Sequence, residues 1–206
     1  TLTAGQKVAG TRVYEYVPNA QTARAVEYGR LYGLDLHSVL FQERSRTFRR
    51  DFLVFELDRE IYRARRYESA LSLALVQVEG LQAGGEAPDT VEQDRLHGEV
   101  FERVAEELRD LDVVSALEDN LAAILLPETP RDAGKQVTRR VCEMIADMQA
   151  VNMREQLEIT CAVGELQEEH ENGIQFFAYV HQALIRAAKD RPGAIVSAED
   201  AEEGVA

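Results

Sequence analysis

The chain has 206 residues, of which 45% are hydrophobic and 29% charged, and its formal net charge at pH 7 is −14. This length suffices for one sizeable hydrophobic core with about 50 residues left for an extension. The acidic balance argues against general nucleic-acid binding, because a phosphate backbone requires clustered Lys and Arg. No apolar run approaches the ~20 residues of a membrane span, and no signal-peptide pattern opens the chain.

The cysteines and histidines form no metal-binding pattern. Cys142 and Cys161 lie inside segments with apolar periodicity, so we expect buried free thiols, which suit a reducing cytoplasm. The histidines are scattered, without the H-x-x-H or H-E-x-x-H spacing of a zinc site. They are His37, His97, His170 and His181. The sequence therefore predicts a cytoplasmic protein with no resident metal.

Residues 1–50 form the least regular part of the chain and are interpreted as an N-terminal extension. Residues 11–17 favour a short strand, and residues 21–32 favour a helix. From His37 onward the spacing predicts a connector helix, with candidate apolar positions at Val39, Leu40, Phe48, Phe52 and Phe55. The arginines at 44–50 are assigned to its solvated side. A nucleic-acid or lipid patch is the less favoured alternative, because Glu43 and Asp51 interrupt the positive charge.

Residues 51–197 alternate between helical and strand periodicity, which indicates one α/β domain. The connector helix should continue to about residue 66, and further helices are expected at 90–109, 128–149 and 174–189. Strands are expected at 70–79, 113–117, 121–126, 157–166 and 194–196. The first of these is almost continuously apolar, as a central strand covered on both faces should be. Residues 198–206 form a small acidic tail that we expect to fray.

Residues 109–126 combine a charged pair with a predicted β-hairpin. Glu118, Asp119 and Asn120 separate the two apolar runs of the hairpin. Asp and Asn tolerate positive φ and hydrogen-bond their own backbone, so this spacing predicts a tight turn. Arg109 and Asp112 precede the hairpin and place a guanidinium and a carboxylate three residues apart.

This arrangement resembles a degenerate GGDEF domain, the domain of the diguanylate cyclase family. In that family an inhibitory Arg-x-x-Asp motif lies five residues before a Gly-Gly-Asp/Glu-Glu-Phe turn. Arg109 and Asp112 keep the first motif, and residues 118–122 replace the second. Residues 51–59 resemble the family's opening D-x-L-T-G-L-x-N-R, and residues 160–165 resemble its T-V-S-I-G-V. The resemblance covers about 51–197 and implies a nucleotide-cyclase-like, mostly antiparallel central sheet flanked by helices.

The resemblance also implies that the chain is not an active diguanylate cyclase. Gln77 and Leu121 take the positions of the family's two metal-binding carboxylates, and neutral side chains do not supply the charge that Mg²⁺ prefers. Glu118 and Asp119 replace glycines that let the backbone approach a GTP phosphate. Ala188 takes the place of a late lysine of the family. We therefore expect no catalytic residues, no metal and no cofactor.

What the resemblance retains is a ligand site for cyclic di-GMP. Arg109, Asp112 and Arg140 stand at family positions that contact this ligand. A guanidinium donates paired hydrogen bonds to guanine edges or phosphates, and a carboxylate accepts from a guanine N–H. The expected function is that of a cyclic di-GMP receptor or regulatory module, acting as a homodimer or with a partner signalling protein.

Three alternatives to this receptor remain open from the sequence. Arg109 and Asp112 could form a surface ion pair, worth ~0–1 kcal/mol of stability, that binds nothing. The domain could serve as a nucleotide-independent structural module for dimerisation or protein docking. It could also bind GTP as a regulator without turnover.

Overall fold

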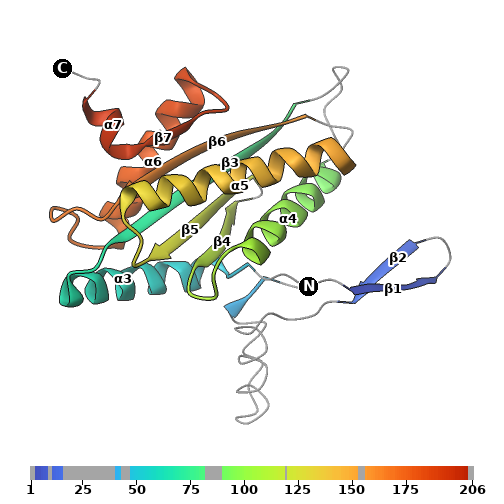
Figure 1. Ribbon diagram of the computed structural model, residues 1–206, viewed down its shortest axis with the longest axis horizontal. Helices are drawn as coiled ribbons and strands as arrows, with labels where there is room; N and C mark the ends of the chain where they lie inside the picture. The colour runs from blue at the N-terminus through green and yellow to red at the C-terminus, as the bar shows by residue number, and fades with distance from the viewer. Residues whose placement is uncertain are drawn as a thin grey trace, which may run out of the picture.

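A five-stranded sheet organises the described part of the chain (Figure 1). The computed structural model describes residues 3–8, 11–15, 40–42, 47–81, 90–118, 120–152 and 156–203. The strands are β3 (Leu71–Leu81), β4 (Val113–Glu118), β5 (Leu121–Pro127), β6 (Gln156–Glu165) and β7 (Ile195–Ser197). They lie in the order β4-β5-β3-β6-β7, with a parallel pairing between β6 and β7 and antiparallel pairing elsewhere. The predicted α/β class with a mostly antiparallel sheet is confirmed.

Helices cover both faces of this sheet. The helices α4 (Thr90–Glu107) and α5 (Arg131–Asn152) pack on one face, in front of the sheet in Figure 1. The helices α3 (Arg50–Tyr67) and α6 (Gly173–Asp190) pack on the other. In β3, Leu73 and Leu75 face α3 and α6, whereas Ala74 and Val76 face α4 and α5. Burial on both faces explains the continuous apolar run of this strand. None of the described helices has the length and apolar character that a membrane crossing requires.

The beginning of the domain differs from the sequence prediction. The connector helix predicted from His37 onward is wrong for the described residues 41, 42 and 47–49, which are not helical, although Leu40 is helical; α3 begins at Arg50. Phe41 and Phe48 form an antiparallel bridge, and Phe48 bridges Ser115 of β4 in parallel. The rings of Phe41, Phe48 and Phe52 stack with successive centroid distances of 4.4 Å. The spacing of Phe48 and Phe52, which the sequence analysis interpreted as one face of a helix, therefore belongs to a stack of rings beside β4.

Two further expectations concern the N-terminal half. Phe55, expected to be apolar and inward, is 64% exposed, because α3 buries the stripe of Leu53, Leu57 and Ile61 instead. The predicted strand at 11–17 corresponds to β2 (Thr11–Glu15), which pairs with β1 (Thr3–Val8). The predicted helix at 21–32 lies outside the described residues.

The acidic C-terminal segment begins as a helix, not as a frayed tail. The helix α7 (Ala198–Glu203) follows β7 directly, and Ala198 is buried. A Glu199 carboxylate oxygen accepts from the Glu165 backbone N–H at 2.8 Å, and Asp200 pairs with Lys135 at 3.1 Å. The acidic residues that suggested disorder thus tie α7 to β6 and α5. The expectation of fraying is wrong for residues 198–203.

Candidate ligand site and degenerate catalytic positions

The turn between α4 and β4 is closed by reciprocal bonds between Arg109 and Asp112. The Asp112 Oδ2 accepts from the Arg109 backbone N–H at 3.0 Å, and the Asp112 N–H donates to the Arg109 carbonyl at 3.0 Å. Asp112 is 8% exposed, whereas Arg109 is exposed. The carboxylate therefore has a structural role in this turn, which uses the backbone of Arg109 and not its guanidinium.

Arg140 on α5 also interacts electrostatically with Asp112. Burial raises the pKa of Asp112, and the Arg109 N–H bond and the positive charges of Arg109 and Arg140 oppose this rise. Arg140 lies far along the chain from the turn, so α5 brings its charge to Asp112 through the packing of α4 and α5 on one face. The charge of Arg140 thus acts on the carboxylate that closes the Arg109–Asp112 turn.

The two guanidiniums at this site are unpaired among the described residues. Arg109 and Arg140 are both exposed, and neither side chain forms an ion pair or hydrogen bond with the described part of the chain. Arg103 on α4 is a contrast, because it pairs with Glu106 at 2.8 Å and Glu107 at 2.6 Å. Free guanidiniums keep their paired donors available for an anion or a guanine edge.

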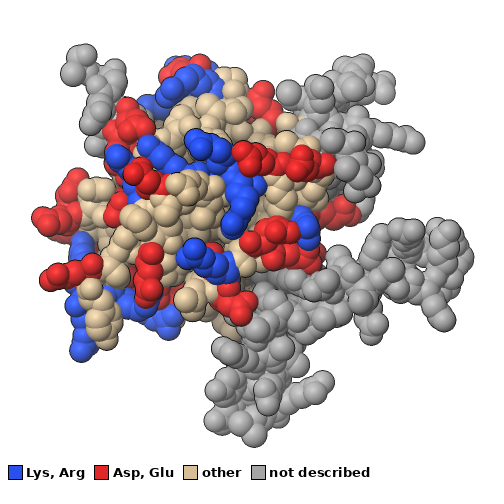
Figure 2. Space-filling view, viewed as in Figure 1, with Lys and Arg blue, Asp and Glu red and all other residues tan. Residues whose placement is uncertain are grey.

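The surface around Arg140 is segregated by charge along α5. In Figure 2, basic side chains gather over the N-terminal half of this helix and acidic ones over its C-terminal half. The order opposes the helix macrodipole, which favours acidic residues at the N-terminus and basic residues at the C-terminus. A groove of about 460 Å³ between α4 and α5 includes Arg140 and Arg103 on its wall, together with Glu143 and Asp147. Glu107 also lines the groove, so its acidic side chains outnumber its basic ones, and Arg140 is the arginine of its wall that has no ion pair among the described residues.

The two residues that the resemblance places at the family's metal-binding positions lie elsewhere on the sheet. Gln77 of β3 and Leu121 of β5 are direct cross-strand partners. The Gln77 Nε2 donates to the Glu79 Oε1 at 2.9 Å, and Leu121 is only 7% exposed in the core beneath α3 and α6. No group of three or more His, Cys, Asp or Glu suited to a metal ion occurs among the described residues. The side chain of Asp119, at the altered turn, lies outside them.

An apolar groove lies beside Leu121, and sequence reasoning missed it. It has a volume of about 410 Å³ between α3, the β4–β5 hairpin and α6. Its apolar lining includes Leu117 and Leu121 from the hairpin and Ile174 from α6, which is 78% exposed. His181 also lines the groove, is half-buried and stacks on Phe177. The spacing of Ile174, Phe177 and His181 on one side of a helix was the available signal.

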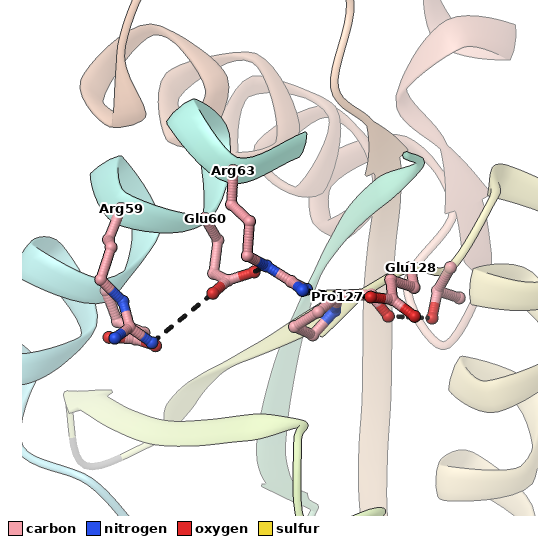
Figure 3. A network of polar contacts seen from close by, with 7 residues as sticks. Arg59, Glu60, Arg63, Pro127 and Glu128 are labelled. Carbon is pink, nitrogen blue, oxygen red and sulfur yellow. Dashed lines mark hydrogen bonds and ion pairs between the residues drawn. The ribbon is translucent and has the colours of Figure 1, made fainter. Parts of the chain in front are cut away.

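A second missed feature is an ionic network on α3. Glu56 and Glu60 are 7% and 6% exposed and pair with Arg59 and Arg63 on the same helix. Figure 3 shows Arg63 between Glu60 and Glu128, with nitrogen–oxygen distances of 2.7 Å and 3.1 Å. Burial raises the pKa of Glu56, which the charge of Arg59 only partly opposes. The spacing of these charges by three residues was visible in the sequence, but their burial was not.

This network lines a cavity on the α3 side of the Arg109–Asp112 turn. The cavity has a volume of about 410 Å³, and Asp110 and Leu111 of the turn also line it. Leu111 is 70% exposed. Asp110 and Leu111, the two middle residues of the turn, thus line a cavity beside α3. The last residue of the turn, Asp112, instead interacts electrostatically with Arg140 of α5.

Comparison with solved structures identifies the fold. The active GGEEF domain of a diguanylate cyclase from Vibrio cholerae has a TM-score of 0.60 and 14% identity, over 72% of this chain and 96% of that one. The coiled coil and GGDEF domain of DgcB from Caulobacter crescentus, in complex with c-di-GMP, has a TM-score of 0.66 and 12% identity, over 86% and 94%. The diguanylate cyclase SiaD from Pseudomonas aeruginosa, in complex with its activator SiaC, has a TM-score of 0.62 and 19% identity, over 86% and 69%.

Comparison of the sequence with protein families and with curated proteins finds no match. No protein-family model matches the chain, and no curated protein matches it significantly. The structural likeness, together with the order of strands and helices, carries the conclusion: the described part of this chain has a GGDEF-like fold.

Proposed function

We propose that this chain is a catalytically inactive GGDEF-like domain that binds cyclic di-GMP through Arg109, Asp112 and Arg140. The observation that supports the proposal most strongly is that two exposed guanidiniums, which have no ion pair among the described residues, act on one buried carboxylate. One structurally similar protein, DgcB, was solved with this ligand in two structures.

The ligand and the site are complementary in charge. Cyclic di-GMP carries two phosphates and two guanine edges, and a guanidinium can donate two parallel hydrogen bonds to either group. The net charge of −14 gives the chain no general attraction for anions, so binding must depend on these local arginines. We therefore expect the site to select a compact dianion with guanine edges and to lose affinity as salt concentration rises.

The proposal of inactivity rests on different residues. Gln77 and Leu121 are neutral, and Leu121 is buried, so neither of these two positions offers a carboxylate to hold Mg²⁺ beside a triphosphate. Phosphoryl transfer depends on metal ions and nearby cations to stabilise developing charge. The domain then binds cyclic di-GMP without making it. Because this messenger is made and bound inside cells, we place the domain in the cytoplasm.

Calorimetric titration tests the receptor function. Cyclic di-GMP should give a saturable binding isotherm, whereas GTP with Mg²⁺ should give none at the same concentration. Binding of GTP·Mg²⁺ with no binding of cyclic di-GMP would replace the receptor by a GTP-binding regulator. The absence of both isotherms would favour the second candidate below.

The second candidate is a structural docking or dimerisation module, and the apolar groove between α3 and α6 favours it. Sedimentation of the wild type against the Ile174→Asp variant tests it, because Ile174 is exposed and its replacement leaves the core intact. A self-associating wild type that becomes monomeric on this substitution would support the docking module. If the wild type and the variant both sediment as monomers, a dimerisation module is excluded.

A further inference from the structure

The two cysteines of the chain meet across the interface between α5 and the sheet. Cys142 lies on α5 and Cys161 on β6, and their sulfur atoms are 3.2 Å apart. The sequence contains two cysteines in all, so each is the partner of the other. Shortening this distance to the ~2.05 Å of a disulfide requires a movement of about 1 Å. As expected from the sequence, both are free thiols in the structure, and Cys161 is buried.

The two thiols are not equivalent. Cys161 is fully buried, whereas Cys142 is half-buried. The hydrogen bond between the sulfurs lowers the pKa of Cys142, although burial and the charge of Glu143 oppose this effect. The same bond, together with burial, raises the pKa of Cys161. Burial disfavours the thiolate of Cys161 more strongly, so Cys142, the more exposed sulfur, more readily becomes a thiolate, which is the nucleophilic form of cysteine.

We propose that Cys142 and Cys161 form a dithiol site that hydroperoxides oxidise to an intrachain disulfide. The Cys142 thiolate attacks one peroxide oxygen; an S–O bond forms, the O–O bond breaks, and the leaving oxygen departs as hydroxide or alkoxide. Cys142 is then a sulfenic acid. The Cys161 sulfur attacks the Cys142 sulfur, the S–O bond breaks, and the Cys161 proton leaves with the hydroxyl as water. The peroxide takes the two electrons that the two sulfurs lose.

The position of the pair supports this assignment over simple core packing. Cys142 is partly exposed, so a small peroxide can reach it, and the second thiol is already in contact when the sulfenic acid forms. The cross-link would join residues 19 positions apart and tie α5 to β6 two residues beyond Arg140. The inference does not depend on ligand binding, and it adds a chemical modification to the helix that carries Arg140.

Intact mass spectrometry of the full chain tests the proposal directly. After reduction and treatment with hydrogen peroxide, the wild type should lose the mass of two hydrogens and all reactivity toward thiol reagents. A non-reducing digest should contain the Cys142 peptide linked to the Cys161 peptide. The Cys142→Ser, Cys161→Ser double variant controls for oxidation of the methionines. The melting temperature of the oxidised wild type should rise by roughly 5 °C, because the disulfide restricts the unfolded chain.

The single variants separate the two thiols. In Cys161→Ser, oxidation should stop at a sulfenic acid on Cys142, which a 1,3-diketone reagent captures. In Cys142→Ser, the folded protein should not react, because its remaining thiol is buried. Three outcomes would overturn the proposal: added oxygen on Cys142 without a cross-link, disulfides between two chains instead of within one, or a cross-link that forms only in denaturant.

Discussion

The α4–β4 turn and the β3–β5 strand pair lie in one domain but differ in the charge of their side chains. The Asp112 carboxylate of the turn is buried and accepts a backbone N–H, and the charges of Arg109 and Arg140, which have no ion pair among the described residues, act on it. The strand pair has Gln77 beside Leu121, an amide bonded to its neighbour and a buried aliphatic side chain. The difference shows that one domain holds charged side chains at the α4–β4 turn and neutral ones at the Gln77–Leu121 pair of its sheet.

The largest expected effect concerns catalysis, which depends on the strand pair. Incubated with GTP and Mg²⁺ or Mn²⁺, the protein should produce no cyclic di-GMP above background, because neither Gln77 nor Leu121 can bind the metal as a carboxylate does. Chromatography of the nucleotides measures the product. Product formation that disappears on replacing Glu118 would show that the altered turn is catalytic after all.

The next effect concerns the guanidinium of the turn. Arg109→Ala should weaken cyclic di-GMP binding by about tenfold to a hundredfold, the range expected for hydrogen bonds to charged groups. Arg109→Lys keeps the charge but removes the paired donors, so it should recover only part of the affinity. Calorimetry measures both variants. Full recovery by lysine would mean that the site recognises charge alone.

A smaller effect separates the structural role of Asp112 from its charge. Asp112→Ala removes the acceptor of the Arg109 N–H and should lower the free energy of unfolding by about 1–2 kcal/mol. Asp112→Asn keeps an acceptor oxygen and should lose less. Gln77→Ala in the strand pair is the control and should change stability by about 0.5 kcal/mol or less, because its partner Glu79 is exposed. Urea unfolding measures all three, and equal losses in the two Asp112 variants would contradict the turn-closing role.

The smallest effect is the pH dependence that Glu56 contributes through the α3 network. Because burial raises the pKa of Glu56 above 4.5, the folded state binds its proton more tightly than the unfolded chain. Its stabilising contribution is full below pH 4.5 and is lost as pH rises through the folded pKa. Glu56→Gln should therefore be at least as stable as the wild type at neutral pH. As pH rises from 4.5 through the folded pKa of Glu56, the variant should lose less stability than the wild type. A variant that is weaker at neutral pH would show that the Arg59 pair outweighs burial.

Much of this architecture could be predicted from the sequence, and the failures have physical causes. The continuous apolar run of β3 and the Asp-Asn turn specify a central strand and a hairpin by local chemistry, so both were found. The stacking of Phe41 and Phe48 over the β4 edge depends on contacts far apart in sequence, and their spacing resembled a helix. The burial of Glu56 and Glu60 also depends on tertiary packing, because isolated charges favour solvent.

The candidate site also has features that could be predicted from local sequence and features that required the structure. Arg109 and Asp112 could be chosen from local spacing, and Arg140 only through the resemblance to a family. That Asp112 is mainly a backbone acceptor required coordinates, because an Arg-x-x-Asp spacing does not distinguish a surface ion pair from a closed turn. The groove beside Leu121 arises from three separate elements and could not be read from any one of them.

The most direct test of the central claim compares two neighbouring arginines of α5. Arg139 and Arg140 are both exposed and have the same charge, but only Arg140 influences Asp112. In calorimetric titrations with cyclic di-GMP, Arg140→Ala should weaken binding at least tenfold, while Arg139→Ala should stay within about threefold of the wild type. Equal losses in the two variants, or a wild type that gives no heat at about 100 µM ligand, would contradict a receptor site built from Arg109, Asp112 and Arg140.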